Sequence, residues 1–233
     1  MESAQTKPRI RVGKTEMDFP HQGKTLTAAY PFYGPANSRT LQNLIREDGY
    51  IEPTSAQSTS FVHEYFNGDE PQAKEVNQIM RNKYFSGFTG ILYVPKEGIA
   101  HFIDYSKFNE NSIVDKDNLL KRLDESYAQV PFEHLKGGSI DWRKVAKHPY
   151  FVAWAGGEEG AEKLAELASK HPGQKAYIWV PDVSNLKEPI ARIATLDFNW
   201  VGPGLCVFSN YHGNEDSFAF GVLKDAEGVA LEK

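Results

Sequence analysis

Histidine and carboxylate side chains are the groups of this chain that could bind a metal ion or move a proton. A metal site needs His, Asp or Glu at spacings that converge, as in HExxH on one helix face. His63 and Glu64 are followed by Asn67 where that motif has its second histidine. His101 and Asp104 lie three residues apart in a predicted strand, so they should point to opposite faces. The sequence therefore predicts no metal site.

Acid–base catalysis without a cofactor is an alternative function that these side chains leave open. Imidazole and carboxylate groups can exchange protons, but catalysis requires that groups from separate segments converge in one pocket. The candidate catalytic residues are His63, His101, Asp104 and His212. Their spacing indicates no particular reaction, so the sequence leaves open whether the chain is an enzyme.

Nucleophilic and phosphate-binding motifs are incomplete in this sequence. Cys206 lies between apolar residues, which favours a buried, inert thiol over a reactive pair with His212. The sequence Gly-Lys-Thr occurs at 13–15 and 23–25, but neither copy has the further glycine that a P-loop places five residues before the Gly-Lys pair. We therefore expect no nucleotide and no other cofactor.

Aromatic and hydroxyl side chains in the N-terminal third indicate a binding surface. Residues 30–35 read YPFYGP and are expected to form an ordered aromatic loop, and residues 54–60 carry five hydroxyl groups and one amide. Rings beside hydroxyls and amides are typical of ligand pockets and of protein interfaces. The alternative for 54–60 is a hydrated helix start with one capping residue. The predicted ligand-binding residues, including a tryptophan in the Gly/Pro-containing loop 199–204, are Tyr30, Tyr33, Asn37, Ser58 and Trp200.

The composition excludes several classes of partner. A net charge of −5 gives no basic field for phosphates, so we expect no nucleic acid partner. No apolar stretch approaches the ~20 residues of a membrane span, and the first residues lack an apolar leader segment. Cys206 is the single cysteine, so it cannot form an internal disulfide. These features predict a soluble, cytoplasmic protein without a membrane partner.

The elements that must position these residues follow from periodicity and turn residues. Residues 88–105 carry β-branched and aromatic side chains on both sides of Pro95–Gly98, which predicts a central β-hairpin. Apolar stripes predict a helix over 39–48, capped by Ser38, and further helices that begin near 54, 71 and 158. C-terminal strands are predicted at 176–180, 190–196, 204–209 and 217–223, the last two as a second hairpin.

This order of elements predicts an α+β protein, with helices packed on a mostly antiparallel or mixed sheet built from the central hairpin and the C-terminal strands. Residues 9–224 should form a single domain between a flexible N-terminus at 1–8 and a frayed C-terminus at 225–233. Polar residues 106–118 offer the only boundary if there are two lobes, at 9–105 and 119–224.

The leading functional hypothesis is a binding protein, because no reactive constellation is complete and aromatic rings are abundant. Its ligand would be a protein partner or a small neutral molecule in a cleft near the central hairpin. A cofactor-free enzyme and a homo-oligomeric structural or assembly protein are the alternatives from other classes.

Overall fold

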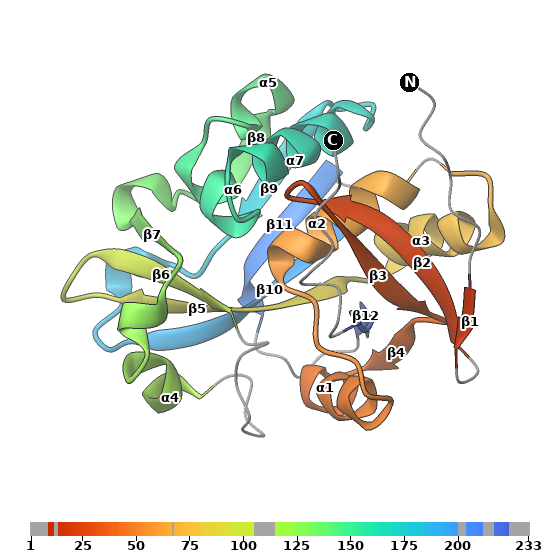
Figure 1. Cartoon of the computed structure of the whole chain (residues 1–233). Helices are drawn as coiled ribbons and strands as arrows, with labels where there is room; N and C mark the ends of the chain where they lie inside the picture. Colours follow the sequence, from red (N-terminus) through yellow and green to blue (C-terminus); the bar gives the residue numbers. More distant parts are fainter. Residues whose placement is uncertain are drawn as a thin grey trace.

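Two β-sheets with helices packed on and between them make up the protein (Figure 1). The computed structural model describes residues 9–11, 14–66, 68–104, 115–199, 204–211 and 217–223. The α+β class predicted from the sequence is confirmed. The smaller sheet is antiparallel, and its strands are β1 (Arg9–Arg11), β2 (Lys14–His21) and β3 (Lys24–Tyr30).

The larger sheet is mixed and has nine strands in the described part of the chain. Its main order is β4-β12-β5-β10-β11-β9-β8, while β6 pairs with β5 and β7 pairs with β6. The pairs β9–β11 and β5–β12 are parallel and the other pairs are antiparallel. Strands on both sides of 106–118 therefore enter the same sheet. The strands are β4 (Tyr33–Ala36), β5 (Phe85–Val94), β6 (Ile99–Asp104), β7 (Ala128–Pro131), β8 (Gly138–Asp141), β9 (Lys175–Trp179), β10 (Ile190–Asn199), β11 (Gly204–Tyr211) and β12 (Ser217–Ala219).

The central hairpin predicted from the sequence is confirmed. β5 is buried along its whole length, because β6 and β10 flank it and core side chains cover both of its faces. The turn closes with Gly98 at φ +66°, a left-handed conformation that a glycine adopts without strain. The hairpin therefore anchors the middle of the larger sheet.

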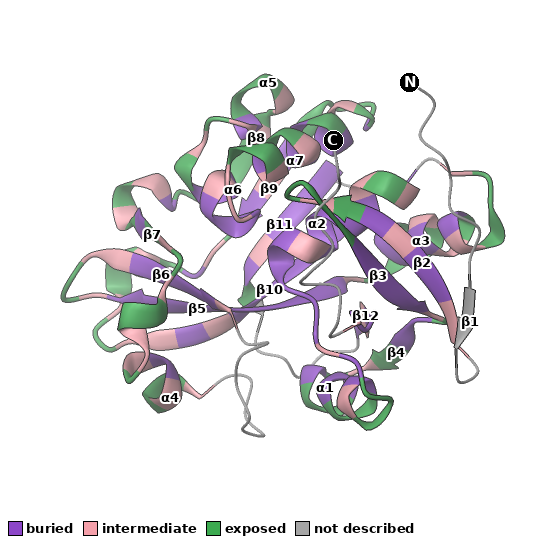
Figure 2. Cartoon of the chain, in the orientation of Figure 1, coloured by how far each residue is buried: buried purple, intermediate pink, exposed green. Residues whose placement is uncertain are grey.

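The helices cover the sheets and meet around α2, which contacts β2, β5, β10, α3 and α7. Figure 2 shows that α2 is largely buried, unlike the outer faces of α1 and α3. None of the described helices is long and apolar enough to cross a membrane. The helices are α1 (Ser38–Glu47), α2 (Ser55–Tyr65), α3 (Pro71–Asn82), α4 (Lys116–Leu120), α5 (Trp142–Val145), α6 (Pro149–Trp154) and α7 (Glu158–Ser169).

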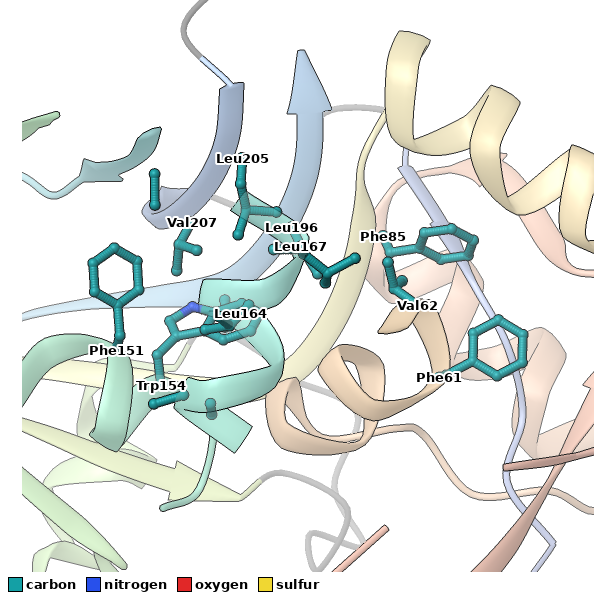
Figure 3. Close-up of a cluster of buried hydrophobic side chains, with 14 of the residues drawn as sticks. Phe61, Val62, Phe85, Phe151, Trp154, Leu164, Leu167, Leu196, Leu205 and Val207 are labelled. Atoms are coloured by element: carbon teal, nitrogen blue, oxygen red, sulfur yellow. The ribbon is translucent and has the colours of Figure 1, made fainter. Parts of the chain in front are cut away.

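The largest core cluster lies where α2, α6 and α7 pack on one face of the larger sheet (Figure 3). Phe61 and Val62 of α2 and Leu164 and Leu167 of α7 are fully buried there. Each such side chain stabilises the fold by about 1.5–3 kcal/mol relative to an exposed position. The sheet contributes alternate residues to this cluster, among them Phe85, Leu196, Leu205 and Val207.

Three local predictions were wrong in the structure. α1 is capped by Asn37 and not by Ser38, because the Thr40 N–H donates to Asn37 Oδ1 at 3.0 Å. The aromatic segment 30–35 was expected as a loop, yet β3 ends and β4 begins within it. β11 and β12 do not form a hairpin, because both edges of β11 are already paired, with β10 and β9, and β12 lies between β4 and β5.

Candidate functional site

The candidate catalytic residues each contact a different partner. His63 Nε2 lies 2.7 Å from Glu166 Oε2, which links α2 to α7. His101 is buried, and its Nε2 lies 2.9 Å from Glu97 Oε2. Asp104 accepts a hydrogen bond from the Thr89 hydroxyl at 3.2 Å. The described residues thus contain no convergent acid–base group from this set, and His212 lies outside them.

A metal site is not assembled by the fold in the part of the chain that the structure describes. Phe102 and Ile103, which follow one another on β6, belong to separate core clusters. This alternation turns His101 and Asp104 to opposite faces of the strand. No group of three or more His, Cys, Asp or Glu side chains within the described ranges could hold an ion.

The hydroxyl-rich segment 54–60 is buried rather than hydrated. Ser55 Oγ donates to the Trp154 carbonyl at 2.5 Å, and the Ser55 N–H donates to Thr89 Oγ1 at 3.0 Å. Thr54 forms a capping box with Gln57. Ser58 has no exposed surface, so a ligand could reach it only after a rearrangement. These hydroxyls hold the first turn of α2 against β5 and the end of α6.

The tyrosines predicted to share one mouth belong to different parts of the core. The Tyr30 hydroxyl donates to Glu75 Oε2 at 2.7 Å, on the α3 side, and its ring packs on the larger core cluster. Tyr33 donates to Asp48 Oδ2 at 2.8 Å and lies in the smaller core cluster. Asn37 is used as the α1 cap, and Trp200 lies outside the described residues. The described members of the predicted ligand-binding set therefore do not lie together at one site.

A polar cluster that the sequence did not indicate joins the β2–β3 turn to α2 and α7. Ser60 Oγ lies 3.0 Å from His21 Nδ1 and 3.1 Å from Lys163 Nζ. Burial, followed by the charge of Lys163, lowers the pKa of His21 to about 4. Since Ser60 is only 3% exposed, its hydroxyl is closed to a substrate, and the cluster serves to fix the three elements together.

Aromatic rings lie side by side on the face of the larger sheet opposite the Figure 3 cluster. Leu205 and Val207 of β11 point into that cluster, so Phe208 points to the opposite face. Trp179 is its register partner on β9. The two rings stack with centroids 5.8 Å apart and planes 11° apart, and the Tyr84 ring meets Phe208 edge-on at 5.5 Å.

Trp179 is 48% exposed although its ring stacks on Phe208. Tyr177 lies two residues earlier on the same strand face, and its register partner is the exposed Ser139 of β8. Among the described residues, neither the Tyr177 hydroxyl nor the Ser139 hydroxyl forms a hydrogen bond. We call Tyr84, Tyr177, Trp179 and Phe208 the aromatic face. Flat rings with adjacent neutral hydroxyls can stack a planar ligand and hydrogen-bond its polar groups.

The exposed hydrophobic side chains of the described residues do not form a broad patch. In the described ranges, the large ones are Leu44 on α1, Tyr127 before β7 and Trp179 on β9. They lie on separate elements, whereas a stable protein interface requires a continuous surface of roughly 800 Å² on each partner.

Comparison with known proteins gives evidence about the fold. No protein-family model matches the chain, and no curated protein matches its sequence. One similar solved structure is described as showing the accommodation of massive sequence variation in Nanoarchaeota by the C-type lectin fold. The two chains share a fold. The TM-score is 0.56 at 16% sequence identity, and the match covers 88% of this chain and 99% of the other.

Proposed function

We propose that this chain is a binding protein whose aromatic face holds a small, neutral ligand with a planar ring. The observation that carries the proposal is the stacked pair of Trp179 and Phe208, of which the tryptophan stays half exposed. A large ring is otherwise buried on folding, because its transfer from water contributes about 25 cal/mol per Å². A ligand that covers Trp179 would recover that contribution.

The strength of such binding can be bounded from stacking energies. A planar base stacked on an aromatic side chain contributes about 1–3 kcal/mol. Stacking together with one or two neutral hydrogen bonds to Tyr177 or Ser139 would give a dissociation constant in the millimolar to micromolar range. Because these contacts involve no ion pair, the affinity should depend only weakly on salt.

Two finer expectations stay part of this proposal. The face adjoins the start of β5, the first strand of the central hairpin, because Tyr84 precedes β5 and its ring contacts Phe208. A location inside the cell is supported by Cys206, the single cysteine, which is buried and forms no disulfide. The scattered positions of the exposed hydrophobic side chains favour a small ligand over a protein partner.

Calorimetric titration of the purified chain with adenosine tests the proposal, with the non-planar alcohol cyclohexanol as the control ligand. We expect saturable binding of adenosine that Trp179→Ala weakens by about tenfold or more, corresponding to at least 1.4 kcal/mol. Leu44→Ala is the matched variant, since it removes an exposed apolar side chain on α1 and should leave the affinity unchanged. Equal weakening in both variants, or equal affinity for cyclohexanol, would contradict the proposal.

A further inference from the structure

A hollow of about 580 Å³ opens on the helix-covered side of the larger sheet. Phe66, at the end of α2, is one of its walls, and the Phe66 ring contacts Phe198 with centroids 4.7 Å apart. Phe198 belongs to the core cluster on this side, so the hollow and the aromatic face lie on opposite sides of the sheet. The hollow is lined by Phe66, Gly68, Lys74, Asn77, Gln78, Arg81, Asn82 and Lys170.

One face of α3 supplies most of the lining. Lys74, Gln78 and Arg81 are spaced by four and three residues, which brings them onto adjacent turns of the same helix face. The opposite face of α3 is apolar, and Val76 and Met80 are fully buried. Core packing therefore fixes the rotation of α3 and holds its cationic and amide side chains toward the hollow. Lys170 follows the last turn of α7 and completes the lining from another element.

The charge of the lining is opposite to that of the whole protein. Among the described residues that line the hollow, three are cations and none is a carboxylate, although the chain carries 31 acidic and 26 basic residues. Of the carboxylates near the lining residues, Glu166 contacts His63 and Glu75 accepts from Tyr30, whereas Glu70 Oε2 lies against Gly68 and offsets one of the three positive charges. This separation of charge makes the hollow a local positive site on an acidic protein.

Two of the lining cations have no counter-charge in direct contact. Within the part of the chain that the structure describes, neither Lys74 nor Lys170 forms an ion pair. Burial lowers the pKa of Lys170, and the nearby Glu166 opposes that effect only in part. A partly desolvated ammonium gains more from an anion than a fully hydrated one does, because less water has to be displaced.

We propose that this hollow binds a small anionic molecule through phosphate or carboxylate oxygens. Lys74, Arg81 and Lys170 supply the positive charge, and the Gln78 amide can donate a neutral hydrogen bond beside them. The volume lies within the range of small-molecule pockets, about 300–1,000 Å³. The site is independent of the neutral ligand proposed for the aromatic face, since the two share no residue.

The test is calorimetric titration of the full chain with inorganic pyrophosphate and, separately, with citrate. The double variant Lys74→Gln with Lys170→Gln removes two cations from the hollow. The double variant Lys96→Gln with Lys144→Gln removes the same charge from exposed positions outside it. We expect the hollow variant to bind pyrophosphate about tenfold more weakly or worse, and the matched variant to differ from the wild type by less than about twofold.

The outcomes of these titrations either identify the class of anion that binds or contradict the proposal. Binding of pyrophosphate alone would assign a phosphate site, and binding of citrate as well would assign a general oxyanion site. Equal weakening in both double variants, or no binding of either pyrophosphate or citrate up to about 10 mM, would overturn the proposal. Tighter binding of a short single-stranded RNA than of pyrophosphate would also overturn it, in favour of a nucleic acid surface. Melting temperatures equal to that of the wild type confirm that both variants fold.

Discussion

Acidification should destabilise the fold through His21, because the folded protein resists protonating this side chain. Its pKa is lowered from 6.5 to about 4 by burial and by Lys163. The neutral ring can accept the Ser60 hydroxyl hydrogen while Lys163 donates to the same oxygen. The unfolded chain takes up the proton near pH 6.5 and the folded chain only near pH 4. The stability is therefore complete above pH 6.5 and falls progressively between pH 6.5 and pH 4.

The size of this effect follows from the two pKa values. The full difference corresponds to about 3 kcal/mol, at 1.36 kcal/mol per pH unit. Between pH 7 and pH 5 the expected loss is about 2 kcal/mol, because the unfolded state is almost fully protonated at pH 5 and the folded state is not. A loss of this size is a substantial fraction of the total stability of a typical domain, about 5–15 kcal/mol.

Urea unfolding at pH 7 and pH 5 measures the effect, with His21→Gln as the comparison. Glutamine keeps a side chain that can hydrogen-bond to Ser60 but does not titrate. Other acid-sensitive groups, among them His148, whose pKa burial also lowers, act equally in both proteins. We expect the pH-dependent loss to be about 2 kcal/mol smaller in the variant. Equal losses in the two proteins would show that His21 is not held neutral by the fold.

Three pairs of substitutions test the packing on which the sites depend, each by urea unfolding. Ile91→Ala or Ile103→Ala should lower the free energy of unfolding by about 2–5 kcal/mol, because both side chains are buried. A loss below about 0.5 kcal/mol in both variants would show that the hairpin side chains do not form part of the core. Gly87→Ala should cost at least about 1–3 kcal/mol, since its Cβ would lie 2.5 Å from Ser55 Cα, whereas Gly137→Ala meets nothing closer than 3.5 Å. Asn37→Ala should lower the free energy of unfolding by about 1 kcal/mol and Ser38→Ala should change it little, because Asn37 caps α1. A larger loss in Ser38→Ala than in Asn37→Ala would show that Ser38 is the cap, as the sequence predicted.

The elements predicted correctly are those whose determinants are local in the sequence. The hairpin at 88–105 carries its turn residues and its strand residues together, and α7 combines strong helix formers with a single apolar stripe. The position of β12 is not local. Its partners β4 and β5 come from the first half of the chain, so adjacency to β11 in the sequence gave the wrong pairing.

The sequence predicted the types of side chain in the candidate site but not which residues form it. Aromatic rings beside hydroxyls were expected to bind a ligand, but Ser58 and Tyr33 are buried by contacts with distant segments. Trp179 and Phe208 become neighbours because β9 and β11 pair in parallel, and no local pattern encodes that pairing. The cationic stripe on α3 is visible in the sequence at a spacing of three and four, whereas Lys170 joins it only in the folded structure.

The most direct test of the central claim is an amide chemical-shift map of the full chain during titration with adenosine. If the aromatic face is the ligand site, the saturable shifts will centre on β9 at 177–179 and on β11 at 206–208, with the Trp179 indole N–H among the largest. The titration should change little when salt is raised from about 50 to 500 mM, because no ion pair is involved. Shifts centred on 30–60, or no saturable shift at Trp179, would contradict the assignment of the binding function to this face.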